Sequence, residues 1–239
     1  MKTLTIKLSQ IYSETGNIEA NVRQMEKTLE LSEYDAVDVT VFPQRFLSGV
    51  LTEETITEAA DTYRTDRFKH FQELARRYNQ WIVFNFPFFT LDGFYDTTVL
   101  LDTNGDIRSL HQSKHIRPVE ASLFQSGELS EPVDTPFGRV VLTTGEDMMQ
   151  ETLPEADWYF IVDACVEGGS EARHERLQAI ERASNGTVVY MNRVGQLNDD
   201  TYGGGSAVYY GGECLTEKKQ TFYTPVITVP PEPKEPWEA

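Results

Sequence analysis

The 239-residue chain is arranged around the stretch Gly138–Met148, GRVVLTTGEDM. Its apolar residues Val140 to Leu142 predict a buried strand, and the acidic pair Glu146-Asp147 is typical of a helix start. The chain must therefore turn sharply from strand to helix at Gly145. Such a corner presents its residue to a cleft beside free backbone N–H groups, and enzymes often place a nucleophile there. Here the corner residue has no side chain.

Strands and helices alternate on both sides of this corner, which predicts a layered α/β fold with sheets covered by helices. We expect strands at 4–8, 37–43, 81–89, 97–102, 106–112, 158–164, 187–192, 206–212 and 225–229, and helices at 18–29, 65–78 and 173–183. No linker interrupts the sequence, so we predict one domain over residues 1–229. The tail at 230–239, PPEPKEPWEA, is rich in proline and should be extended.

The composition excludes several classes of partner. With 38 acidic and 21 basic residues, the formal charge of −17 would repel nucleic acid and anionic membranes. No stretch approaches the roughly 18 apolar residues needed to span a bilayer, and the N-terminus lacks the features of a signal peptide. Only Cys165 and Cys214 are present, and we expect both to be thiols in a cytoplasmic protein.

Several segments resemble, in order, the carbon–nitrogen hydrolase (nitrilase) superfamily. FPQRFLSGV at 42–50 is similar to FPE.f.tGY, and FYDTTVLLDTNGDI at 94–107 to iYNsavvid.dGei. SKHIRP at 113–118 resembles rK.hL.P, and GRVVLTTGED at 138–147 resembles Gk.gv.ICyD. MNRVG at 191–195 and YGGGSAV at 202–208 are similar to NrvG and f.GgS.i. The resemblance implies a four-layer αββα sandwich, with two central sheets covered by helices.

Members of this family cleave nonpeptide carbon–nitrogen bonds with a Cys nucleophile, a Glu general base and a Lys that stabilises the tetrahedral intermediate. The resemblance places the base at Gln44, the lysine at Lys114 and the nucleophile at Gly145. Glu120 falls where many members carry a second glutamate. A glutamine amide cannot take up a proton at neutral pH, and a glycine cannot form a covalent intermediate. The sequence therefore predicts a catalytically degenerate member.

The remaining polar residues could form a non-reacting pocket. Lys114 and Glu120 could pair inside it and hold a carboxylate, an amide or a carbonyl group. Each position also has a plainer explanation: Gly145 as a turn residue, Gln44 as a satisfied buried amide, and Lys114 as a surface lysine.

Two features offer rival chemistry. Cys165 follows the predicted strand 158–164, whose end would line the pocket, so it is the alternative nucleophile; a water held by Glu120 is another route. His111 and His115 have the spacing of helical metal ligands, but their segment is predicted as strand and loop. We therefore expect no metal and no cofactor.

We therefore expect a pseudoenzyme that binds a small amide- or carboxylate-like ligand, or a partner subunit. The partner would be a second copy in a homodimer, or an active homologue in a heteromer. The alternatives are an active carbon–nitrogen hydrolase using Cys165 or a water held by Glu120, and a purely structural protein. In the structural protein, aromatic side chains such as Phe46, Phe84 or Phe86 would fill the cleft.

Overall fold

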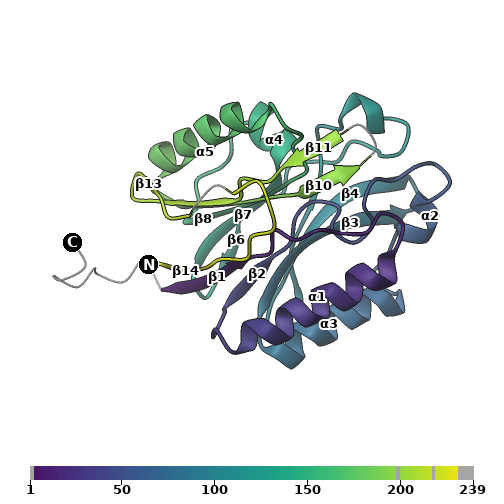
Figure 1. Cartoon of the computed structure of the whole chain (residues 1–239), viewed down its shortest axis with the longest axis horizontal. Helices are drawn as coiled ribbons and strands as arrows, with labels where there is room; N and C mark the ends of the chain where they lie inside the picture. Colours follow the sequence, from purple (N-terminus) through teal and green to yellow (C-terminus); the bar gives the residue numbers. More distant parts are fainter. Residues whose placement is uncertain (1–2, 198–199, 217–218, 231–239) are drawn as a thin grey trace.

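The computed structural model describes residues 3–197, 200–216 and 219–230. Two six-stranded sheets pack face to face, and helices cover the outer side of each (Figure 1). The predicted αββα sandwich is confirmed. The predicted tail at 230–239 lies outside the described residues except for Pro230. The single domain over 1–229 stays a prediction.

The first sheet is built around three parallel strands with antiparallel strands on either side. Its order is β14 (Val226–Val229), β1 (Leu4–Leu8), β2 (Val39–Val41), β3 (Trp81–Thr90), β4 (Gly93–Leu101) and β5 (Ile107–Gln112). The predicted strands at 97–102 and 106–112 form the antiparallel pair β4 and β5, and the apolar run at 81–89 forms the buried strand β3.

The second sheet also has three parallel strands at its centre. Its order is β13 (Glu213–Cys214), β12 (Ala207–Tyr210), β9 (Thr187–Asn192), β8 (Trp158–Asp163), β7 (Gly138–Thr144) and β6 (Val133–Thr135). A separate hairpin of β10 (Val194–Leu197) and β11 (Asp200–Gly203), which the sequence did not indicate, follows β9.

The covering helices begin at the residues that cap them. The Asn17 side chain accepts the Ala20 N–H at the start of α1 (Ile18–Glu33), and the Thr65 side chain caps α3 (Asp66–Tyr78) in the same way. These two helices lie side by side against the first sheet (Figure 1). The second sheet is covered by α4 (Gly145–Gln150) and α5 (Ser170–Ser184), and two short helical turns are α2 (Ile56–Ala59) and η1 (Pro118–Glu120).

The buried apolar residues form one core between the sheets, one under each helical layer, and a smaller cluster of Leu51, Ile56, Ala59 and Phe124. Leu142, Phe160 and Met191 belong to the core between the sheets. A different core contains Phe46, Phe84 and Phe86 together with residues of α1 and α3. The hypothesis that these three phenylalanines fill the cleft is therefore wrong, because they face the helices that cover the first sheet.

The parallel strands β2, β7, β8 and β9 position the candidate site. The segments that follow their carboxyl ends carry Gln44, Gly145, Cys165 and Arg193, the edge at which α/β proteins usually bind ligands. The guanidinium of Arg193 donates to the backbone carbonyl of Arg45 over 3.2 Å, which ties the two sheets together at this edge. Among the described residues, no helix has the length and apolar character required to cross a bilayer.

Candidate functional site

A buried carboxylate, Asp96 on β4, organises one half of the site. It accepts hydrogen bonds from the side chains of Gln44 (2.5 Å), Asn85 (2.8 Å) and Ser113 (3.3 Å). All four side chains are buried. We use the name buried polar cluster for Gln44, Arg45, Asn85, Asp96, Ser113, Arg117 and Glu120.

The cluster exchanges an amide and a carboxylate relative to the family pattern. Gln44 stands where FPE.f.tGY has a glutamate, and Asp96 stands where iYNsavvid.dGei has an asparagine. The amide of Gln44 donates to Asp96, so in this chain the amide and the carboxylate are hydrogen-bonded to each other. Gln44 is thus a satisfied buried amide, and an amide has no capacity to act as a general base.

Arg45 fills the space beside this pair, and sequence reasoning missed it. Its backbone has φ = 58°, the left-handed region, held by a bond from the Arg45 N–H to the Asn85 side chain. Its guanidinium lies 3.3 Å from Asp96 and 2.7 Å from Glu120, and 5.3 Å from the centre of the Phe124 ring. A buried arginine of this chain therefore lies between the two carboxylates of the cluster.

Glu120 receives two guanidinium groups. Arg117 donates to both of its oxygens, over 2.9 and 2.8 Å, and Arg45 contacts both as well. Fork-like pairs of this kind are strong charge-assisted contacts. Glu120 is thus fully engaged, and the expected pair between Lys114 and Glu120 is wrong.

Lys114 lies outside the cluster. Its ammonium pairs with Glu151 at 2.5 Å, and its side chain is 42% exposed. Counted back from Pro118, the pattern K.hL.P places its lysine on Ser113, which is buried and bonded to Asp96. Successive residues of an extended chain point to opposite sides, so the one-residue shift moves the side chain from the cluster to the surface.

The strand–helix corner is filled by a side chain from the neighbouring strand. A Cβ atom added to Gly145 would overlap the carboxylate of Asp163. The parallel pairing of Thr144 with Val162 brings these two residues together. A glycine is therefore required at position 145 for steric reasons, because the Asp163 carboxylate occupies the space that a larger side chain would take.

Asp163 is itself held on several sides. It accepts hydrogen bonds from Arg173 (2.6 Å), Tyr190 (2.9 Å) and the Ala164 N–H (2.7 Å). Arg173 also pairs with Glu146 at 2.6 Å, so the first acidic side chain of α4 is tied to the same network. Burial and the negative charge of Asp163 raise the pKa of Tyr190, which stays a neutral donor.

Asp147, in the same corner, anchors the segment that carries the lysine motif. Its carboxylate accepts from the N–H groups of Lys114 (3.0 Å) and His115 (2.7 Å) and pairs with the His111 ring at 2.7 Å. Burial acts to raise its pKa, but the bonds from His111 and from the two N–H groups outweigh burial and lower it. His115 pairs with Glu151 instead.

No group of three metal-binding side chains occurs among the described residues. The His111 ring pairs with Asp147 and the His115 ring with Glu151, so the two histidines contact different carboxylates.

Cys165, the rival nucleophile, lies directly after β8. It is 3% exposed, and its thiol donates to the Val166 carbonyl at 3.2 Å. Burial and the charge of Asp163 raise its pKa to about 11. Because the thiolate is the reactive form, this environment disfavours nucleophilic attack.

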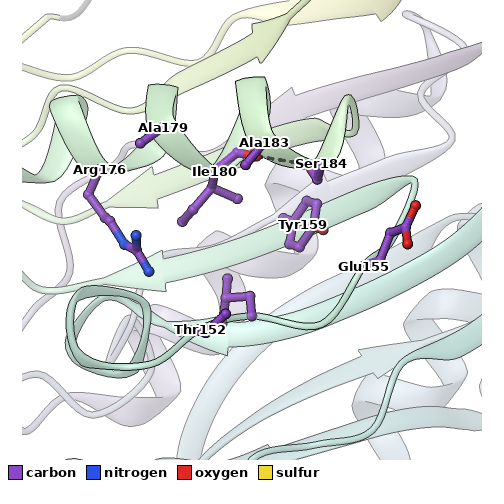
Figure 2. A pocket seen from close by; sticks show the side chains of 9 residues that line it. Thr152, Glu155, Tyr159, Arg176, Ala179, Ile180, Ala183 and Ser184 are labelled. Atoms are coloured by element: carbon purple, nitrogen blue, oxygen red, sulfur yellow. Dashed lines mark hydrogen bonds between the residues drawn. The ribbon is translucent and has the colours of Figure 1, made fainter.

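A separate pocket of about 230 Å³ lies on the outer side of the second sheet, between α5 and the segment before β8 (Figure 2). Arg176 points into it, but its guanidinium donates to the carbonyls of Met148 and Glu151. None of the predicted site residues lines this pocket.

Residues 5–211 match the carbon-nitrogen hydrolase family. Solved structures with the same fold include XC1258 from Xanthomonas campestris, a CN-hydrolase superfamily protein with an arsenic adduct in its active site. It has a TM-score of 0.86 at 20% identity over 95% of this chain and 91% of its own. Nit3 from Saccharomyces cerevisiae, of the nitrilase superfamily, has a TM-score of 0.84 at 17% identity over 95% and 90%.

A third similar structure is a double mutant of the amidase from Nesterenkonia sp. AN1 in complex with acrylamide. In it a glutamate is replaced by glutamine and a cysteine by alanine. Its TM-score is 0.82 at 17% identity, covering 95% of this chain and 90% of that one. A comparison with curated proteins finds no match.

Proposed function

This chain belongs to the carbon–nitrogen hydrolase family, and we propose that it binds a small ligand or a partner subunit but does not hydrolyse carbon–nitrogen bonds. One observation carries the proposal. The carboxylate of Asp163 occupies the space beside Gly145 in which the side chain of a nucleophile would stand.

Two further positions support the proposal. The base position holds Gln44, and the lysine position, counted back from Pro118, holds Ser113. A triad acts as a unit, so the loss of a nucleophile alone typically costs orders of magnitude in rate. With no base, no nucleophile and no lysine, the family's reaction has no starting step in this chain.

We propose two forms of binding. In the first, the site holds a small amide- or carboxylate-like ligand, which must share the site with Arg45 and Asp163. In the second, the chain associates with a partner subunit, either a second copy of itself or an active homologue. The mass in solution, measured alone and after mixing with an active amidase of the family, separates these partners. We also propose a cytoplasmic location, because both cysteines are free thiols.

The direct test is hydrolysis of a broad panel of small amides and nitriles, followed by mass spectrometry. The purified protein should form no product above the buffer background. Product formation that disappears in Cys165→Ser or Glu120→Gln, but not in the exposed control Glu54→Gln, would overturn the proposal.

The alternative is an active hydrolase that uses Cys165 or a water held by Glu120. The raised pKa of Cys165 weighs against the thiol, and the two arginines on Glu120 weigh against its acting as a base. Intact-mass analysis after incubation with iodoacetamide at pH 7 tests the first route. We expect Cys165 to stay unmodified in the folded protein, and rapid modification there would revive the alternative.

A further inference from the structure

Arg45 is a buried guanidinium that is surrounded as a bound ligand is surrounded. Its side chain is 3% exposed, and its guanidinium lies 3.3 Å from Asp96 and 2.7 Å from Glu120. The centre of the Phe124 ring is 5.3 Å from its Cζ atom. Carboxylates at the edge and an aromatic ring against the face are the contacts that a planar guanidinium prefers. The buried polar cluster therefore has the chemistry of a guanidinium site.

The backbone of Arg45 adopts a conformation that is rare for arginine. Its φ of 58° lies in the left-handed region, which favours glycine. The side chain of Asn85 accepts the Arg45 N–H over 3.0 Å, and the guanidinium of Arg193 donates to the Arg45 carbonyl over 3.2 Å. Residues other than glycine keep such a conformation only where their surroundings hold it, and such residues concentrate at functional sites.

The two carboxylates have other partners besides Arg45. Glu120 accepts two hydrogen bonds from Arg117, over 2.9 and 2.8 Å. Asp96 accepts hydrogen bonds from the side chains of Gln44, Asn85 and Ser113. These bonds do not involve Arg45, so the carboxylates remain positioned when its side chain is removed. The space left behind would then be lined by the same two acceptors and the same ring.

We propose that Arg45 is an internal ligand, whose guanidinium fills a site for a guanidinium or amidinium cation and closes the buried polar cluster to small molecules. This inference rests on the proposed function and decides between its two forms. A cluster that is closed by Arg45 takes up no small ligand, so the form that remains is association with a partner subunit.

The experiment is thermal unfolding of the full chain and of Arg45→Gly in millimolar methylguanidinium chloride or methylammonium chloride. Glycine removes the side chain and suits the φ of 58°. In Arg45→Gly, methylguanidinium should raise Tm above its value in methylammonium by roughly 3–6 °C for each tenfold increase above its Kd. In the unmodified protein the two salts should give the same Tm, because Arg45 fills the site. A guanidinium-specific shift in the unmodified protein, or none in Arg45→Gly, would overturn the proposal.

Arg193→Ala is the matched control. Arg193 is as buried as Arg45, but its guanidinium contacts the Arg45 carbonyl and the Tyr202 ring, with no carboxylate paired to it in the described ranges. This variant should show no guanidinium-specific shift, and a shift equal to that of Arg45→Gly would overturn the proposal. Adding Glu120→Gln to Arg45→Gly should weaken methylguanidinium binding at least tenfold, and unchanged binding would contradict the assignment of the site.

The same salts give an answer if Arg45→Gly does not fold by itself. The variant is then refolded in each salt, and cooperative unfolding should return in methylguanidinium and not in methylammonium. Its return in both salts, or in neither, would overturn the proposal.

Failure of this inference is separable from failure of the proposed function. A missing guanidinium-specific shift in Arg45→Gly, with no amide hydrolysis by the unmodified protein, removes the internal ligand alone. Hydrolysis of an amide by the unmodified protein removes the proposed function, whatever the two salts do.

Discussion

The protein has two interiors of opposite character, the apolar core between the sheets and the buried polar cluster at the strand ends. In the core, Leu142 and Phe160 are buried among other apolar side chains. In the cluster, Asp96 and Glu120 are equally buried, but each is held by arginine, amide or hydroxyl donors from distant parts of the chain. We therefore expect the core to tolerate substitutions that keep side-chain volume and apolar character, whereas the stability of the cluster depends on the pairing of each charge.

The largest effect should come from breaking one of those pairs. Glu120→Gln removes the charge that faces two buried guanidinium groups while keeping the size of the side chain. We expect a loss of about 3–5 kcal/mol in the free energy of unfolding. Urea denaturation measures it, and the exposed Glu54→Gln should change stability by less than about 0.5 kcal/mol. Equal, small losses in both variants would show that the ion pairs of the cluster do not stabilise the fold.

A conservative change in the core should have a much smaller effect. Leu142→Met keeps an apolar side chain of similar volume at a position that is 1% exposed. The expected cost in urea denaturation is below about 1.5 kcal/mol. If this cost exceeds that of Glu120→Gln, the contrast between the two interiors does not hold.

The mildest test uses pH. Because the folded-state pKa of Asp147 lies below its ordinary value of 3.8, its contribution to stability is complete above that value and is lost as the pH falls through the folded-state pKa. Asp147→Asn should therefore lower stability at neutral pH, and the difference from the unmodified protein should shrink as the pH falls below 3.8 and through the folded-state pKa. Parallel curves of stability against pH would contradict this role for Asp147.

Most of the fold could be predicted from the sequence because its signals are local. The alternation of residues in β1, the cap at Asn17 and the apolar run of β8 each depend on neighbours in the chain. The exceptions are the hairpin of β10 and β11, the short strands β6 and β13, and the short helical turns α2 and η1, which lack a clear period.

The candidate site could be predicted only in part. Gln44 and Gly145 were found from their motifs, but the filling of their spaces by Arg45 and Asp163 depends on long-range packing. For the lysine position, counting back from Pro118 selects Ser113 and not Lys114. Asp163 could be foreseen only from the register of β7 and β8.

We propose that Asp163 occupies the place of the nucleophile and that Gly145 makes room for it. A double-mutant cycle of Gly145→Ala and Asp163→Ser, followed by urea denaturation, tests this claim most directly. Gly145→Ala should cost about 1–3 kcal/mol when Asp163 is present, because the new methyl group overlaps the carboxylate. In the Asp163→Ser background the same change should cost almost nothing. Equal costs in both backgrounds would contradict the claim.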